Sequence, residues 1–222
     1  MDQYYPAVKA LYDDRGRKPL FSAEFVSHPH CLPSPNSALT SSNEGNPNFS
    51  CNDLFAQVMK IGTAPSTQKV VFGGNWWLSP GYNGEALRSF GGAIRELKAH
   101  GKQVFVILDN PQGDEFDPLA IMRMNRLNAY FGNGQNIARG NRAVPSDKVE
   151  AESEARQIEF RKITAQNGAV IIDPYLYLCP HKQCPVLIEG EPTHRDTNHL
   201  RPFYSRKFGA AMFRDIVFAQ PQ

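Results

Sequence analysis

An aspartate and a histidine stand three residues apart in the segment THRDTNHL, residues 193–200, shortly before Pro202. Histidine takes up and returns a proton near neutral pH, and a carboxylate bonded to its far ring nitrogen fixes the tautomer and stabilises the imidazolium. If the loop curls back on itself, Asp196 and His199 form such a pair, and its nucleophile lies elsewhere. The alternative is structural: Asp196 makes a turn and His199 caps the next helix, because an isolated D-x-x-H has a high false-positive risk.

The four cysteines fall in two loop-like segments. Cys179 and Cys184 stand in LCPHKQCP, while Cys31 and Cys51 bracket a stretch rich in Pro, Ser and Asn. Three pairings are open, and the simplest joins Cys31 to Cys51 and Cys179 to Cys184. Disulfides would indicate an oxidising compartment.

Zinc is the rival interpretation of the second cysteine segment. His181 lies between Cys179 and Cys184, and His194 follows in the sequence. The C-x4-C spacing lacks a second close cysteine pair, so we expect a disulfide there and no metal site.

Length and composition are those of an ordinary globular domain. The 222 residues are 41% hydrophobic and 21% charged with a formal net charge of +2, which predicts one domain over residues 1–222. There is no basic excess, so we expect no nucleic-acid partner. No apolar stretch approaches the ~20 residues that span a bilayer, and the acidic start MDQYYPAVKALYDD lacks the pattern of a signal peptide.

The apolar pattern predicts helices that alternate with strands. Short apolar runs predict strands at 19–25, 69–74, 103–108 and 169–174, and CPVLIEGEPTHRD predicts a hairpin that turns at Glu189 and Gly190. Helices are predicted before Gly16, at 51–62 from Asn52 or Asp53, from Asn83 to Gly101, at 117–131, at 146–168 and from Pro202 onward. This alternation is typical of a doubly wound α/β domain with a mostly parallel sheet.

In such sheets the working residues lie at the carboxyl ends of the strands. Three ends carry polar or aromatic residues: GGNWW at 73–77, DNPQ at 109–112, and the loop that ends at His199. Each has a structural interpretation as well, since the glycines can turn the chain, the tryptophans can fill the core and Asp109 can cap a loop.

The end of the chain resembles a known family. DPYLYLCPHKQCPVLIEGEPTHRDTNHLRPFYSRKFGAAMF, residues 173–213, is similar to the end of SGNH-hydrolase domains fused to membrane acyltransferases of the acyltransferase 3 type. The residues that match the family's closing segment are Asp173, Cys179, Cys184, Gly190, Asp196, His199, Leu200 and Gly209. VVFGGNWW, VFVILDNPQ and HCLPSP resemble earlier segments of the family, so the resemblance covers nearly the whole chain.

The resemblance implies a three-layer α/β/α SGNH-hydrolase fold, flavodoxin-like, with a mostly parallel sheet. The opening helix DQYYPAVKALYDDRG is similar to the helix that directly follows the family's G-D-S-H nucleophile motif, yet the 222 residues contain no Gly-Asp-Ser. Ser79 and Ser205 lack the strand-to-helix elbow that would expose a nucleophile. We therefore expect the first strand and the serine to be missing, as in a fragment, a truncation or a degenerate copy.

For the chemistry, the resemblance implies acyl transfer through a serine ester, with His199 as the base and Asp196 orienting it. We expect the backbone of Gly74 and the side chain of Asn75 to contribute to an oxyanion hole. Trp76 and Trp77 are expected to stack on a sugar near the site. No cofactor is expected.

The resemblance also implies a setting. The family's membrane portion passes an acyl group, usually acetyl, across the bilayer, and the SGNH domain places it on, or removes it from, a cell-surface glycan. This chain would lie on the periplasmic face of a bacterial inner membrane and, without its serine, would be inactive alone. The alternative is a non-catalytic glycan-binding or accessory domain that keeps the fold; a third hypothesis is a zinc-binding module.

Overall fold

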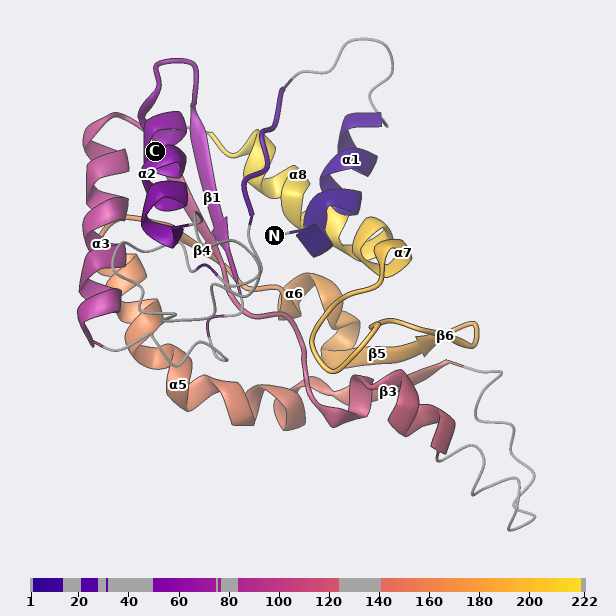
Figure 1. The fold of residues 1–222 in the computed structure, drawn as a ribbon. Helices are drawn as coiled ribbons and strands as arrows, with labels where there is room; N and C mark the ends of the chain where they lie inside the picture. Colours follow the sequence, from indigo (N-terminus) through magenta and orange to yellow (C-terminus); the bar gives the residue numbers. More distant parts are fainter. Residues whose placement is uncertain are drawn as a thin grey trace, which may run out of the picture.

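A three-stranded parallel sheet forms the centre of the fold (Figure 1). The computed structural model describes residues 2–13, 21–27, 31, 50–74, 76, 84–123 and 141–220, with the backbone alone described at 152–156. The strands are β1 (Lys69–Gly73), β2 (Gln103–Ile107) and β4 (Val170–Ile172), in the order β1-β2-β4. Gly73 pairs with Ile107 and Ile107 with Ile172, so the three strands end at one edge of the sheet.

One face of the sheet is covered by α2 (Cys51–Thr63), α3 (Gly84–Ala99) and α5 (Ser146–Gln166). Val104 and Val106 of β2 point to this face and belong to its buried apolar cluster. Leucines, isoleucines and phenylalanines three and four apart in α3 fill the space between helix and sheet, as the predicted periodicity requires.

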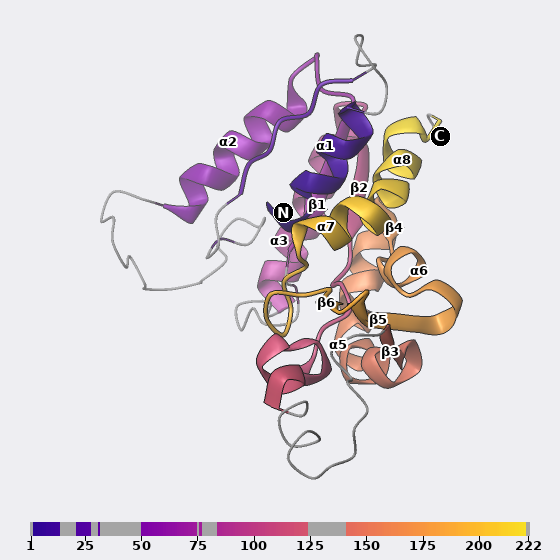
Figure 2. The ribbon, with the colours of Figure 1, turned by 90° about the vertical axis from the view of Figure 1, so that its right-hand side faces the viewer.

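The opposite face is covered by α1 (Tyr5–Asp13) and α8 (Ala210–Phe218), which lie side by side in both views (Figures 1 and 2). Phe105 and Ile107, the alternate residues of β2, belong to this second cluster. A strand with apolar residues on both faces must be covered on both sides. The three-layer α/β/α architecture is therefore confirmed.

A second, antiparallel sheet packs beside the first. It is formed by β3 (Arg142–Pro145), β5 (Gln183–Ile188) and β6 (Glu191–Pro192), in the order β3-β5-β6. The turn between β5 and β6 is at Glu189 and Gly190, with φ of 54° and 83°. Two positive φ values in a two-residue loop suit the right-handed twist of a hairpin. The predicted hairpin is confirmed, whereas β3 was not predicted.

The C-terminal helix begins at Pro202, as predicted, but is not uniform. α7 (Pro202–Tyr204) passes into a π-helical turn at Ser205–Gly209 and then into α8. A Cβ atom at Gly209 would lie 3.2 Å from the Cβ of Ala7, so glycine lets this turn approach α1 closely. The remaining regular elements of the described residues are α6 (Tyr175–Leu178), helical residues 118–123, and 3-10 turns at Asp2–Tyr4, Asp114–Phe116 and Pro180–Lys182.

The N-cap of helix α2 lies two residues before the first of its predicted caps. The cap is Ser50, whose hydroxyl accepts a hydrogen bond from the Asp53 N–H at 3.3 Å, instead of Asn52 or Asp53. The hydroxyl satisfies one of the free N–H groups at the helix start, which is the role assigned in the prediction to the following polar residues. The predicted cap Asn83 lies outside the described residues, as does the part of the 117–131 helix beyond its helical residues 118–123.

The strand predicted at 19–25 is wrong for the residues that the structure describes. Residues 21–27 form neither helix nor strand. Phe21 packs edge-on against Tyr12, and Phe25 packs edge-on against Tyr5, both on α1. The two phenylalanine side chains thus pack against α1, and their segment pairs with no strand in the described part of the chain.

None of the described helices is long and apolar enough to cross a lipid bilayer.

Candidate functional site

Asp196 and His199 lie against one another. The imidazole Nδ1 is 2.8 Å from Oδ2 and 3.0 Å from Oδ1 of the carboxylate. A carboxylate can only accept, so the ring hydrogen sits on Nδ1 and leaves the Nε2 lone pair available in the neutral form. Within the described residues Nε2 has no hydrogen-bond partner, and the His199 side chain is 46% exposed. The loop thus curls back as predicted, and the imidazole meets the carboxylate through Nδ1.

Asp196 also makes the turn that brings His199 into place. Its Oδ1 accepts the backbone N–H groups of Asn198 at 3.0 Å and His199 at 2.7 Å. Partial burial alone would raise the pKa of Asp196, but these N–H donors and the imidazole outweigh it and hold the pKa below its usual value. The carboxylate is therefore ionised at neutral pH. His199 does not cap the next helix, because the N-cap of α7 is Arg201.

The loop is anchored at the carboxyl edge of the parallel sheet. The Gly113 N–H donates to the Thr197 carbonyl at 2.8 Å, and Asn110 Nδ2 donates to the Asn198 carbonyl at 2.8 Å. Both donors come from the segment that follows β2. The pair is thus held where the strands of an open α/β sheet end, which is the position at which such folds bind ligands.

The end of β1 contributes differently from the prediction. Gly74 follows β1 and is partly buried, while Asn75 and Trp77 lie outside the described residues. Trp76 is 5% exposed, and its Nε1 donates to the Ile107 carbonyl at 2.7 Å.

Trp76 packs against Phe90 and Phe160, with ring centroids 5.4 Å and 4.5 Å away. A ring enclosed in this way cannot stack on a sugar, so that expectation is wrong for Trp76. Its apolar faces are satisfied in the core and its single polar atom by a strand carbonyl. The Trp76 N–H donates to the buried Asp109 carboxylate at 2.7 Å, so Asp109 caps this loop.

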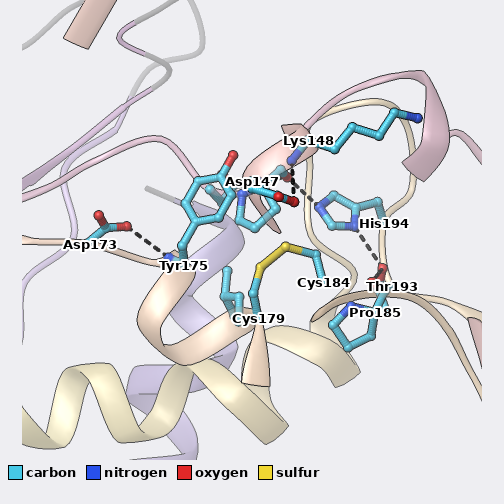
Figure 3. Close-up of a disulfide and its surroundings, with 12 residues drawn as sticks. Asp147, Lys148, Asp173, Tyr175, Cys179, Cys184, Pro185, Thr193 and His194 are labelled. Atoms are coloured by element: carbon cyan, nitrogen blue, oxygen red, sulfur yellow. Dashed lines mark hydrogen bonds between the residues drawn. A yellow bond between two sulfur atoms is a disulfide. The ribbon is translucent and has the colours of Figure 1, made fainter. Parts of the chain in front are cut away.

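His194, at the start of the same segment, is a buried structural histidine. It is 1% exposed, its Nε2 donates to the Pro111 carbonyl at 2.9 Å, and its Nδ1 lies 2.9 Å from Thr193 Oγ1 (Figure 3). The Phe116 ring centroid is 4.4 Å from the imidazole centroid. Burial lowers the pKa of His194 to about 4, so the ring is neutral at pH 7.

All four cysteines are paired, and the pairing is the simplest of the three. Cys31 bonds to Cys51, and Cys179 bonds to Cys184. Figure 3 places the second disulfide between α6 and β5, near Tyr175 and His194. Oxidised sulfurs are not thiolate ligands, and both nitrogens of His194 face other partners. Among the described residues, no cluster of His, Cys, Asp and Glu is arranged to hold a metal ion.

Of two polar residues near the pair, Gln3 was not singled out in the sequence and Asn110 was named only as part of the DNPQ segment. Gln3, in the first 3-10 turn, donates to Asn110 Oδ1 at 2.9 Å and accepts the Leu200 N–H at 3.0 Å. The available signal was the place of Asn110 directly after a buried strand. Ser205, considered and set aside as a nucleophile, is fully buried inside the π-helical turn.

Comparison with known families gives one match. Residues 2–214 match the family described as the SGNH domain fused to AT3 domains. No curated protein and no solved structure matches the chain significantly. The family match covers nearly the whole chain, including the Asp196–His199 loop and the first part of α8.

Proposed function

Because the chain belongs to the family of SGNH domains fused to AT3 domains, we propose that it takes part in O-acyl transfer to, or hydrolysis from, a cell-surface glycan. The family places the chain among hydrolase-fold domains that work beside a membrane acyltransferase domain. The acyl group in this proposal is acetyl. The working location is the periplasmic face of a bacterial inner membrane, which the two disulfides support.

The observation that carries the proposal is the Asp196–His199 hydrogen bond at the carboxyl edge of the sheet. His199 has its hydrogen on Nδ1, held by an ionised carboxylate at 2.8 Å, and its Nε2 has no partner among the described residues. This is the arrangement that a general base needs in a serine-dependent acyl transfer. His199 is the proposed base, and Asp196 orients it.

The reaction proceeds in two halves. In the first, Nε2 of His199 accepts the serine hydroxyl proton as the serine oxygen bonds to the acyl carbon, and the imidazolium then protonates the departing alcohol. In the second, His199 deprotonates a glycan hydroxyl or a water molecule, which attacks the serine ester and releases the acyl group; the proton returns to serine. Asp196 stabilises the imidazolium in both halves.

The tetrahedral intermediates need donors for their oxyanion. We propose the Gly74 N–H and the Asn75 side chain, because Gly74 directly follows a strand that ends at the same edge as β2. Each such donor typically contributes about 3–4 kcal/mol to the transition state. Trp77 remains a proposed sugar contact.

The serine is the part of this proposal that the 222 residues do not contain as Gly-Asp-Ser. In the proposal it comes from residues outside this sequence, and the chain alone is inactive. The same observation favours a second candidate, a non-catalytic glycan-binding or accessory domain. In that case His199 and Asp196 would serve only the loop structure.

The two candidates are separated by replacing His199 with alanine in cells that make the protein and measuring the O-acetyl content of the surface glycan. The catalytic proposal expects the O-acetyl groups to fall to background. The control is His181→Asn, an exposed histidine at φ 56° where asparagine is well tolerated. Unchanged O-acetylation with His199→Ala would favour the accessory role.

A second measurement addresses the serine itself. The purified 222-residue chain is expected to give negligible turnover of a simple acetyl ester, because His199 has no serine to activate. Turnover that disappears with His199→Ala would mean that a nucleophile is present within the chain.

A further inference from the structure

Two side-chain amides from distant parts of the chain meet beside His199. Gln3 lies in the 3-10 turn Asp2–Tyr4, and Asn110 follows β2. Gln3 Nε2 donates to Asn110 Oδ1 at 2.9 Å across 107 positions of sequence. Asn110 is 6% exposed, so its amide group depends on protein partners for its hydrogen bonds.

The two amides hold the residues on either side of His199. The Leu200 N–H donates to Gln3 Oε1 at 3.0 Å, and Asn110 Nδ2 donates to the Asn198 carbonyl at 2.8 Å. Together with the Gln3–Asn110 bond, these contacts form a continuous chain of hydrogen bonds that starts at Leu200 and ends at Asn198. This chain of hydrogen bonds makes no contact with the backbone of His199 itself.

The amide contacts add to bonds that the loop makes itself: the Arg195 N–H donates to the His199 carbonyl at 2.9 Å, and His194 and Leu200 form an antiparallel bridge. Residues 195–199 form neither helix nor strand, and the side chains of Asp196 and His199 are about half exposed. A loop of this kind samples several conformations unless hydrogen bonds or packing hold it. The amide chain instead fixes it to a rigid strand end and to the first turn of the described chain.

We propose that Gln3 and Asn110 are positioning residues for His199. They act through the backbone of Asn198 and Leu200, so that the imidazole keeps its Nδ1 against Asp196 and its Nε2 in one direction. Catalytic groups must be held within about 0.5 Å of their productive geometry, and a displacement of about 1 Å can cost 100-fold in rate. The inference rests on the proposed role of His199 as a base and names the residues that hold it.

The test is a nuclear magnetic resonance experiment on the disulfide-bonded chain, with three variants. Gln3→Ala removes the acceptor of the Leu200 N–H and the donor to Asn110. Asn110→Ala removes the contact with Asn198. The control is Gln166→Ala, which changes an exposed glutamine at the end of α5.

Two signals are followed at a pH where the ring is neutral: hydrogen exchange of the Leu200 amide and the tautomer of the His199 ring from its nitrogen shifts. In Gln3→Ala we expect Leu200 to exchange about two- to tenfold faster, the usual weight of one hydrogen bond. We also expect the second tautomer of His199 to appear. Gln166→Ala should change neither signal.

The conservative variant Gln3→Glu sharpens the result. Glutamate keeps an oxygen for the Leu200 N–H but cannot donate to Asn110 Oδ1, so Leu200 should regain its protection while the second tautomer of His199 is only partly suppressed. If the tautomer stays single in both Gln3→Ala and Asn110→Ala while Leu200 exchanges faster, the amides are structural and the inference is overturned. No acyl transfer is measured, so the outcome is independent of the proposed function. Gln3 is only partly buried, so its variants should fold even if Asn110→Ala does not.

Discussion

The two histidines of the segment 193–200 have opposite environments. His194 is 1% exposed, donates from Nε2 to a backbone carbonyl and has its pKa lowered by burial to about 4. His199 is half exposed, donates from Nδ1 to an ionised carboxylate and leaves Nε2 without a partner among the described residues. The buried ring supports the fold in its neutral form, whereas the exposed ring is the proposed general base. The same side chain serves structure or chemistry according to burial and partners.

The largest expected effect concerns the exposed histidine, His199, and its partner Asp196. Asp196→Asn keeps an oxygen for the N–H groups of Asn198 and His199 but removes the charge that faces the imidazole. Acyl transfer measured in cells should fall by about 10⁴-fold, the loss seen when the orienting carboxylate of a triad is removed. The free energy of unfolding should change by less than about 1 kcal/mol, because the pair is exposed.

A matched control for this change is Asp117→Asn. Asp117 also accepts a backbone N–H two residues on, from Leu119 at 2.9 Å, but within the described part of the chain no histidine is bonded to its carboxylate. It should leave acyl transfer unaltered. Equal losses in the two variants would mean that turn formation, and not the charge on Asp196, is what acyl transfer requires.

The second prediction concerns the buried half. The pKa of His194 is about 4 in the folded chain and about 6.5 in the unfolded chain, so between these values the unfolded chain binds more protons. The stability from keeping His194 neutral is fully present above pH 6.5 and is lost as the pH falls toward 4. The loss corresponds to about 3 kcal/mol.

Urea unfolding at a series of pH values measures this loss directly. His194→Gln removes the titrating group, so its stability should decline less steeply between pH 6.5 and 4 than that of the wild type. The exposed His100 is the control site, and His100→Gln should keep the wild-type slope. A wild-type slope in His194→Gln would assign the acid sensitivity to other groups.

The sequence predicted those elements of the structure that have local signals. Continuous apolar runs such as VFVI predict strands covered on both faces, and Glu189 with Gly190 predicts a tight hairpin turn; both are local signals. β3 was missed because four residues that include a proline have little strand signal of their own. Its pairing partner β5 lies some 40 positions away and decides its conformation.

For the candidate site, the sequence indicated which types of residue take part better than it indicated where the fold places them. Asp196 and His199 could be identified because three-residue spacing lets a turn bring both side chains together. The Gln3–Asn110 contact joins groups 107 positions apart, so only the topology of the fold creates it. The sequence left Trp76 open between a sugar contact and the core, because its burial depends on Phe90 and Phe160 of two helices that only the fold brings against it.

The smallest expected effect tests whether His194 and the Asp196–His199 pair are supported independently. The Cys179–Cys184 disulfide closes a loop with a sequence separation of 5, and it lies in the apolar cluster beside His194. Replacing both cysteines with alanine should lower the free energy of unfolding by about 2 kcal/mol, since closing a short loop restricts the unfolded chain least.

Loss of the disulfide should also loosen the packing around His194 and allow its imidazole to be protonated more easily, so the resonances of His194 and Phe116 should shift. The segment after β2 contacts both histidine regions, but Asp196 and His199 lie outside the cluster around the disulfide and their loop is also held by Gln3, so the His199 resonances should shift less than those of His194. Resonance shifts of His199 as large as those of His194 would mean that the same contacts support both histidines. The proposed division between a structural His194 and a chemical His199 would then no longer hold.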